Sequence, residues 1–187
     1  MYETVREWQF DSRLGKQYRA VFVGYATRKA SFARQDWECA LIYKSFRWNS
    51  DEYETLRQAI TSVGDSQMIV TSIQSEPLHR WSCLVSTDRE SYLKMLRDPH
   101  FDFLPAVNSA MFSPSGKWGI LVNEGNSNST GLGYAVVSGE PEFMTPLVAA
   151  RGGWVKMKDD FTRLLSDPFF NATAEDKRSL LADANWK

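Results

Sequence analysis

Few side chains in this sequence have the types and spacing that catalysis requires. The chain contains only two histidines, His79 and His100, and two cysteines, Cys39 and Cys83. Cys83 lies four residues after His79, but the residues around the pair are not typical of a nucleophilic cysteine and its base. A zinc site needs clustered ligands at short spacings, and the sequence has no such cluster. The sequence therefore predicts no catalytic residue and no metal site.

Two short motifs match functional patterns only in part. Ser91–Lys94 fits Ser-x-x-Lys on an expected helix, but the Ser-Asp-Asn and Lys-Thr-Gly elements that accompany it in acyl-transfer enzymes are absent. Gly131-Leu132-Gly133 leads into an expected strand, whereas a pyrophosphate-binding loop leads into a helix. We therefore expect Lys94 to be solvated, the two glycines to be structural, and no cofactor to bind.

The charged residues do not indicate a nucleic-acid-binding surface. The formal net charge is −1, so the chain has no global basic field that would attract phosphates. Residues 44–48 alternate basic and aromatic side chains, which could stack single-stranded bases, but at this net charge we favour long basic side chains that cover a sheet face and expect no nucleic-acid partner. The acidic pairs Asp159-Asp160 and Glu175-Asp176 fall in expected first turns of helices, where they complement the helix dipole.

Length and composition indicate a single domain over residues 1–187. The chain is 43% hydrophobic and 24% charged, as in ordinary globular proteins. Its apolar runs are far shorter than the roughly 20 residues that span a bilayer, so we expect no membrane insertion. Residues 1–7 lack the basic start and apolar core of a secretory signal, which predicts a cytoplasmic protein with free, buried thiols. A Cys39–Cys83 disulfide stays open, because the sequence gives no distances.

Hydrophobic periodicity predicts strands and helices in the order strand-strand-helix, three times, with extra pieces in the third round and a helical tail. The expected strands cover residues 18–25, 37–48, 67–73, 80–86, 106–112, 117–123 and 131–138. The expected helices cover residues 50–63, 87–97, 143–151, 155–166 and 173–184, the second of them beginning with a capping box of Thr87 and Glu90. Short connections between strands favour an α+β domain with a mostly antiparallel sheet and helices packed on one face.

The ends of two expected helices share a pattern, at residues 92–102 and 161–171. Each has an aromatic residue, a base, a leucine, Asp-Pro and a phenylalanine at matching positions. Proline stops each helix, and we expect Phe101 and Phe170 to be buried at the sheet edge. The upstream residues do not match, which favours two independent helix ends over an internal duplication.

One segment resembles a known class of proteins. Ser113–Glu124 forms a turn and a Trp-bearing strand, and a polar loop joins it to the strand and acidic-Phe segment Tyr134–Phe143. This succession is similar to small bacterial immunity proteins of polymorphic or contact-dependent toxin systems. The resemblance implies a cytoplasmic, non-enzymatic protein that neutralises a toxin by occlusion, and it carries over no functional residue.

The sequence leaves two functions open. The first is binding of another protein, with aromatic anchors and the polar 124–130 loop at the interface; its expected residues are Glu124, Asn126, Ser127, Asn128 and Trp118. The second is binding or turnover of a small ligand in a pocket lined by Trp, Tyr and an Arg. A flat face rich in exposed Trp would favour the first, and a deep apolar pocket with convergent polar groups would favour the second. The sequence also leaves the oligomeric state open.

Overall fold

The computed structural model describes residues 2–5, 13–23, 32–43, 48–72, 82–98, 109–123, 134–167 and 173–183. Its strands are β1 (Tyr2–Val5), β2 (Glu38–Tyr43), β3 (Gln67–Ser72), β4 (Ser82–Ser86), β5 (Ser109–Phe112), β6 (Trp118–Asn123) and β7 (Tyr134–Gly139). Its helices are α1 (Arg13–Val21), α2 (Ser50–Ser62), α3 (Arg89–Leu96), α4 (Pro141–Ala150), α5 (Trp154–Leu165) and α6 (Ala174–Asp183). The predicted α+β class is confirmed.

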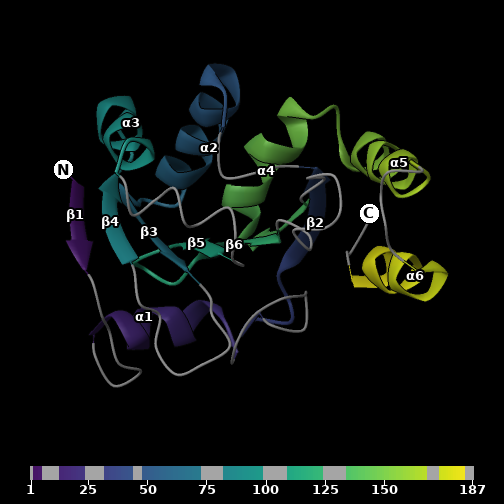
Figure 1. Cartoon of the computed structure of the whole chain (residues 1–187), viewed down its shortest axis with the longest axis horizontal. Helices are drawn as coiled ribbons and strands as arrows, with labels where there is room; N and C mark the ends of the chain where they lie inside the picture. Colours follow the sequence, from purple (N-terminus) through teal and green to yellow (C-terminus); the bar gives the residue numbers. More distant parts are fainter. Residues whose placement is uncertain are drawn as a thin grey trace.

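The seven strands form one sheet in the order β1-β4-β3-β5-β6-β7-β2 (Figure 1). Every pair of neighbours is antiparallel, as the short connections predict. The central strands follow one another closely along the chain, whereas the N-terminal strands β1 and β2 form the two edges.

Helices cover both faces of this sheet. α2, α3 and α4 lie on one face, as predicted, and α1 lies on the opposite face (Figure 1). Two apolar clusters fill the spaces between sheet and helices, and β7 contributes alternate residues to each: Ala135 and Val137 to one, Tyr134 and Val136 to the other. All six residues of β7 are buried, because a strand covered on both faces has no solvent side. α5 contacts the edge strand β2 and lies at that end of the sheet.

The prediction of a strand over residues 18–25 is wrong, because residues 13–21 form α1. Its β-branched and aromatic residues favoured a strand, but Tyr18, Val21 and Phe22 are also spaced as one face of a helix. All three are buried against the sheet, whereas Arg19 and Ala20 between them are exposed. The helical period explains this pattern of burial, and tertiary packing overrides the local propensity.

Gly119 on β6 lets the end of α1 approach the sheet closely. A Cβ atom at this position would lie 2.5 Å from Val21 Cγ1 and 2.7 Å from Phe22 Cζ. These distances are far shorter than van der Waals contact, so a side chain here would push the helix away. The small residue therefore sets how tightly α1 packs.

The helix ends follow the predicted stops more closely than the predicted starts. α3 ends at a C-cap at Arg97 and α5 at a C-cap at Ser166, in each case just before Asp-Pro. The N-cap of α3 is Asp88, and the predicted capping box of Thr87 and Glu90 is wrong, because the side chain of Asp88 accepts a hydrogen bond from the backbone N–H of Ser91. Phe101 and Phe170 lie outside the described residues.

The aromatic residues that the structure describes serve mainly as core. Trp37, Trp48 and Trp118 are buried, and the ring of Trp118 stacks on Phe143 with centroids 4.9 Å apart. Tyr53 and Tyr92 stack between α2 and α3 at 4.0 Å. Each aromatic ring buries a large apolar area, so stacked rings help a single layer of helices to cover each face of the sheet.

Candidate functional site

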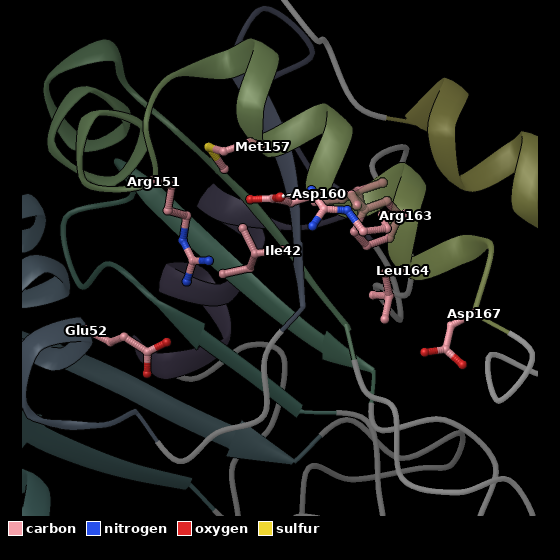
Figure 2. A pocket seen from close by; sticks show the side chains of 10 residues that line it. Ile42, Glu52, Arg151, Met157, Asp160, Arg163, Leu164 and Asp167 are labelled. Carbon is pink, nitrogen blue, oxygen red and sulfur yellow. Dashed lines mark hydrogen bonds and ion pairs between the residues drawn. The ribbon is translucent and has the colours of Figure 1, made fainter.

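A hollow of about 500 Å³ opens between α5 and β2, beside the N-terminal end of α2 and the C-terminal end of α4 (Figure 2). Its volume lies within the usual range for small-molecule sites. The apolar lining residues are Leu41, Ile42, Met157, Phe161 and Leu164. The charged lining residues are Glu52, Arg151, Asp160, Arg163 and Asp167. The hollow thus combines an apolar wall with converging charges.

Arg151 is positioned by an abrupt change of chain direction. It is the C-cap of α4, and Gly152 and Gly153 follow it with φ angles of +82° and +94°. Side chains other than glycine rarely adopt such angles, so the two glycines allow the sharp connection from α4 into α5. The guanidinium of Arg151 extends toward the space between Ile42 and Glu52 (Figure 2).

The guanidinium of Arg151 has no acceptor within the part of the chain that the structure describes: neither a hydrogen bond nor an ion pair holds it. The side chain is half-buried. Burial lowers the pKa of Arg151, while the nearby carboxylates of Glu52 and Asp160 act in the opposite direction. An arginine stays charged even so, and a buried charge without a hydrogen-bonding partner is costly. Arg151 therefore presents a desolvated, positively charged donor fork to the hollow.

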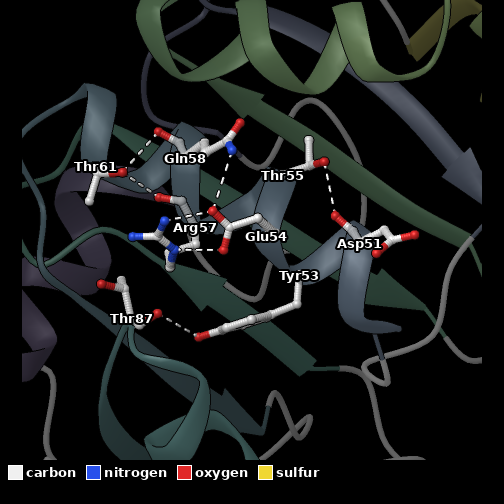
Figure 3. A network of polar contacts seen from close by, with 8 residues as sticks. All are labelled: Asp51, Tyr53, Glu54, Thr55, Arg57, Gln58, Thr61 and Thr87. Atoms are coloured by element: carbon white, nitrogen blue, oxygen red, sulfur yellow. Dashed lines mark hydrogen bonds and ion pairs between the residues drawn. The ribbon is translucent and has the colours of Figure 1, made fainter.

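Arg57 on α2 differs from Arg151 in that its guanidinium has a carboxylate partner. Its Nε and Nη2 atoms donate to both carboxylate oxygens of Glu54, at 2.8 and 2.6 Å (Figure 3). Glu54 also accepts a hydrogen bond from Gln58, one turn further along the helix. Arg57 is thus bound by its own helix and lies outside the hollow, which makes it a matched control for Arg151.

The carboxylates of the hollow have partners in the protein. Asp160 accepts hydrogen bonds from Lys156 at 3.0 Å and from Arg163 at 2.8 Å. The hydrogen bond from Lys156, and then the positive charges of Lys156 and Arg163, lower the pKa of Asp160. Glu52 accepts from the backbone N–H of Asn49 at 3.0 Å and so completes the capping box of α2. Both carboxylates are therefore held in place, and that of Asp160 is ionised at neutral pH.

The structure does not place the predicted partner-binding residues at a common surface. Glu124, Asn126, Ser127 and Asn128 lie outside the described residues. Trp118 is fully buried, and its indole N–H donates to Asp65 Oδ2 at 3.0 Å. Because a buried, hydrogen-bonded indole cannot touch another protein, Trp118 is a core residue and its assignment to the interface is wrong.

The predicted ligand pocket matches the hollow only in its arginine. The aromatic lining residue is Phe161, and neither Trp nor Tyr is among the described residues that line it. Sequence reasoning missed Arg151 itself. Its one local signal was an arginine before Gly-Gly at a helix end, whereas its neighbours Ile42 and Glu52 are about 100 residues away in the sequence.

Comparison of the chain with protein-family models, with curated proteins and with solved structures finds no match. In the described ranges, no three His, Cys, Asp or Glu side chains come together as metal ligands. None of the helices described above has the length and apolar character needed to cross a membrane. The geometry of the hollow is thus the main guide to function.

Proposed function

We propose that this protein binds a small organic molecule in the hollow, through an anionic group held by Arg151. The observation that carries this proposal is the half-buried guanidinium without an acceptor among the described residues. A planar guanidinium forms two parallel hydrogen bonds to a carboxylate or a phosphate, which gives both affinity and orientation. An anion bound there would satisfy the donors and offset the cost of burying the charge.

The apolar wall supports a ligand with a hydrophobic body. Ile42, Met157 and Phe161 are packed in the core and reach the hollow only with the small part of each side chain that stays exposed, whereas Leu164 is half-buried and offers more apolar surface. Covering this surface removes apolar area from water, at roughly 25 cal/mol per Å². We therefore expect a molecule with one anionic end and an apolar body, which binds to a site that is already formed.

The test is a screen of small carboxylates and phosphate esters with apolar substituents, read out by thermal unfolding of the whole chain. We expect hits to raise the Tm of the wild-type protein and of Arg57→Met, and to leave Arg151→Met unchanged. Loss of one bidentate charged contact weakens binding by roughly a hundredfold. Hits that stabilise Arg151→Met as much as wild type would overturn the proposal.

Protein binding stays a second proposal, supported by the resemblance of residues 113–143 to immunity proteins. It would place the protein in the cytoplasm, in keeping with its two free cysteines. Capture of a toxin domain with equal affinity by wild type and Arg151→Met, together with an empty ligand screen, would support protein binding over ligand binding.

A further inference from the structure

The cations around the hollow differ in whether a carboxylate of the protein already holds them. Lys156 donates to one oxygen of Asp160 at 3.0 Å, and Arg163 donates to the other at 2.8 Å. Arg151 has no such acceptor within the part of the chain that the structure describes. A ligand in the hollow therefore meets one available guanidinium, whose planar fork offers two parallel N–H donors.

This donor set fits a carboxylate better than a phosphate monoester. A carboxylate is planar, carries a single charge and has two oxygens, which two N–H groups of one guanidinium bind side by side. A phosphate monoester carries a charge of roughly −1.5 to −2 at neutral pH and has three terminal oxygens. One guanidinium would leave part of that charge and at least one oxygen without a partner, and a partly desolvated site makes this costly.

The apolar lining of the hollow extends away from Arg151 along one side of α5. Met157, Phe161 and Leu164 are spaced four and three residues apart, which places them in a row on the helix surface. Seven residues separate the first from the last, so the row is about 10 Å long. In Figure 2, Arg151 and Leu164 lie on opposite sides of Ile42. The available charge and the most exposed apolar side chain of the lining are therefore at different ends of the hollow.

We propose that the ligand is an unbranched monocarboxylic acid, of the class of medium-chain fatty acids. Its carboxylate binds Arg151, and its alkyl chain lies along α5 as far as Leu164. This inference rests on the proposed function and specifies both the anionic group and the shape of the apolar body. The core residues of the wall expose little surface to the hollow, so a slender alkyl chain matches the wall better than a bulky ring does.

The experiment varies the alkyl chain and the anionic group separately. Butanoate, hexanoate and octanoate differ in length, whereas octyl phosphate and octanamide replace the carboxylate at the end of a long chain. Calorimetry on the whole protein measures binding below the micelle concentration of each probe, with butanoate in competition with octanoate. The proteins are wild type, Arg151→Met, Arg57→Met, Leu164→Ser and Val155→Ser. Val155 is an exposed apolar residue of α5 outside the lining, so Val155→Ser is the matched control for Leu164→Ser.

From butanoate to octanoate, each added pair of CH₂ groups should strengthen binding to wild type by roughly three- to tenfold, because it removes more apolar area from water. Octyl phosphate and octanamide should each bind about tenfold or more weakly than octanoate. Leu164→Ser should weaken octanoate binding by at least about threefold and leave butanoate binding unchanged, which also shows that this variant is folded. Arg151→Met should lose all three carboxylates, and the two control variants should behave like wild type.

Three other results overturn the inference in distinguishable ways. If octyl phosphate binds as tightly as octanoate and depends on Arg151, the carboxylate is wrong and the anion site stands. If butanoate binds as tightly as octanoate, or if Leu164→Ser binds octanoate as Val155→Ser does, the extended chain is wrong and the anion site again stands. If no probe depends on Arg151, the whole inference is wrong, and the screen of the previous section then decides whether the anion site is wrong as well.

Discussion

At the scale of single residues, Asp65 has the most demanding role outside the hollow. Its Oδ2 atom accepts hydrogen bonds from the indole of Trp118 at 3.0 Å and from Ser113 Oγ at 2.5 Å. Asp65 follows α2, whereas Ser113 and Trp118 flank the turn between β5 and β6. One buried carboxylate thus joins a helix end to a hairpin far along the chain.

We predict that Asp65→Ala destabilises the fold by about 2–4 kcal/mol, because it leaves two buried donors without their acceptor. Urea unfolding followed by tryptophan fluorescence measures the change. Asp65→Asn retains an oxygen that can accept both bonds and should cost clearly less. Equal stability of Asp65→Ala and wild type would show that the network contributes little.

The candidate site could not be found from residues taken one at a time. Arg151 has no catalytic motif around it, and its significance depends on what surrounds the guanidinium in space. Leu41 and Ile42 come from one edge strand, and Met157 and Phe161 from a helix more than 100 residues later. Sequence periodicity predicts the strand β2 and the helix α5, but it does not predict that they lie against each other. Nothing in the sequence therefore indicated the hollow between them.

At the scale of elements, the N-terminus of α3 depends on one side chain. Asp88 accepts a hydrogen bond from the backbone N–H of Ser91 at 2.8 Å, and chiefly this bond holds the pKa of Asp88 below its ordinary value of 3.8. A carboxyl group with a lowered pKa in the folded state stabilises that state while it is ionised. The contribution is complete above about pH 4 and is lost as the pH falls through the folded-state pKa.

We predict that Asp88→Ala costs about 1 kcal/mol at pH 7, the usual value for a lost N-cap. The difference from wild type should shrink as the pH falls below 4, in unfolding curves recorded from pH 7 to pH 2.5. Asp88→Asn keeps a cap but has no titrating group. Its difference in unfolding free energy from wild type should change by only a few tenths of a kcal/mol below pH 4, because solvent screens the exposed charge of Asp88. A pH-independent effect of Asp88→Ala would contradict this account.

Docking of α1 gives a second prediction at this scale. Gly119→Ala places a Cβ against Val21 and should cost about 2 kcal/mol through overpacking. Adding Val21→Ala removes the nearest atom, so the double variant should lose less than the sum of the two single losses. Chemical denaturation of the four proteins measures the coupling. Strict additivity would mean that α1 and β6 do not meet at this point.

The elements that the sequence predicted correctly share a physical reason. Residues 67–72 and 118–123 are apolar and β-branched over lengths typical of strands, and polar turns bound them. Residues 18–25 have the same composition, but residues 18–21 are the end of a helix, because the burial of Tyr18, Val21 and Phe22 follows a helical period that composition does not report. Residues 18–21 belong to α1, the helix that covers the second face of the sheet. Because this segment was predicted as a strand, the prediction placed helices on one face only.

At the scale of the whole molecule, the strand order separates the two cysteines. Cys39 lies on β2 and Cys83 on β4, with four strands between them. Five strand spacings place them about 24 Å apart, and they belong to apolar clusters on opposite faces of the sheet. A disulfide needs Cα atoms within about 7 Å, so the folded chain cannot form a Cys39–Cys83 bridge.

We therefore predict that both thiols stay reduced and unreactive in the native protein. Burial raises the pKa of Cys83, which lowers its thiolate fraction further. A thiol reagent such as DTNB should label neither cysteine within minutes, and both of the chain's cysteines once urea has unfolded it. Mass spectrometry after mild oxidation checks for a bridge; an intramolecular disulfide in folded protein would contradict the strand order.

The position of β2 at the edge of the sheet has a consequence for how the protein is made. Glu38 pairs with Gly139, so the partner of β2 leaves the ribosome about 100 residues after β2 itself. At roughly 5–20 residues per second, the N-terminal part of the nascent chain waits on the order of 5–20 s before that partner exists. During this interval its apolar strand can associate with other chains. Slow translation of residues 44–133 should therefore lower the yield of native protein more than slow translation of residues 140–187.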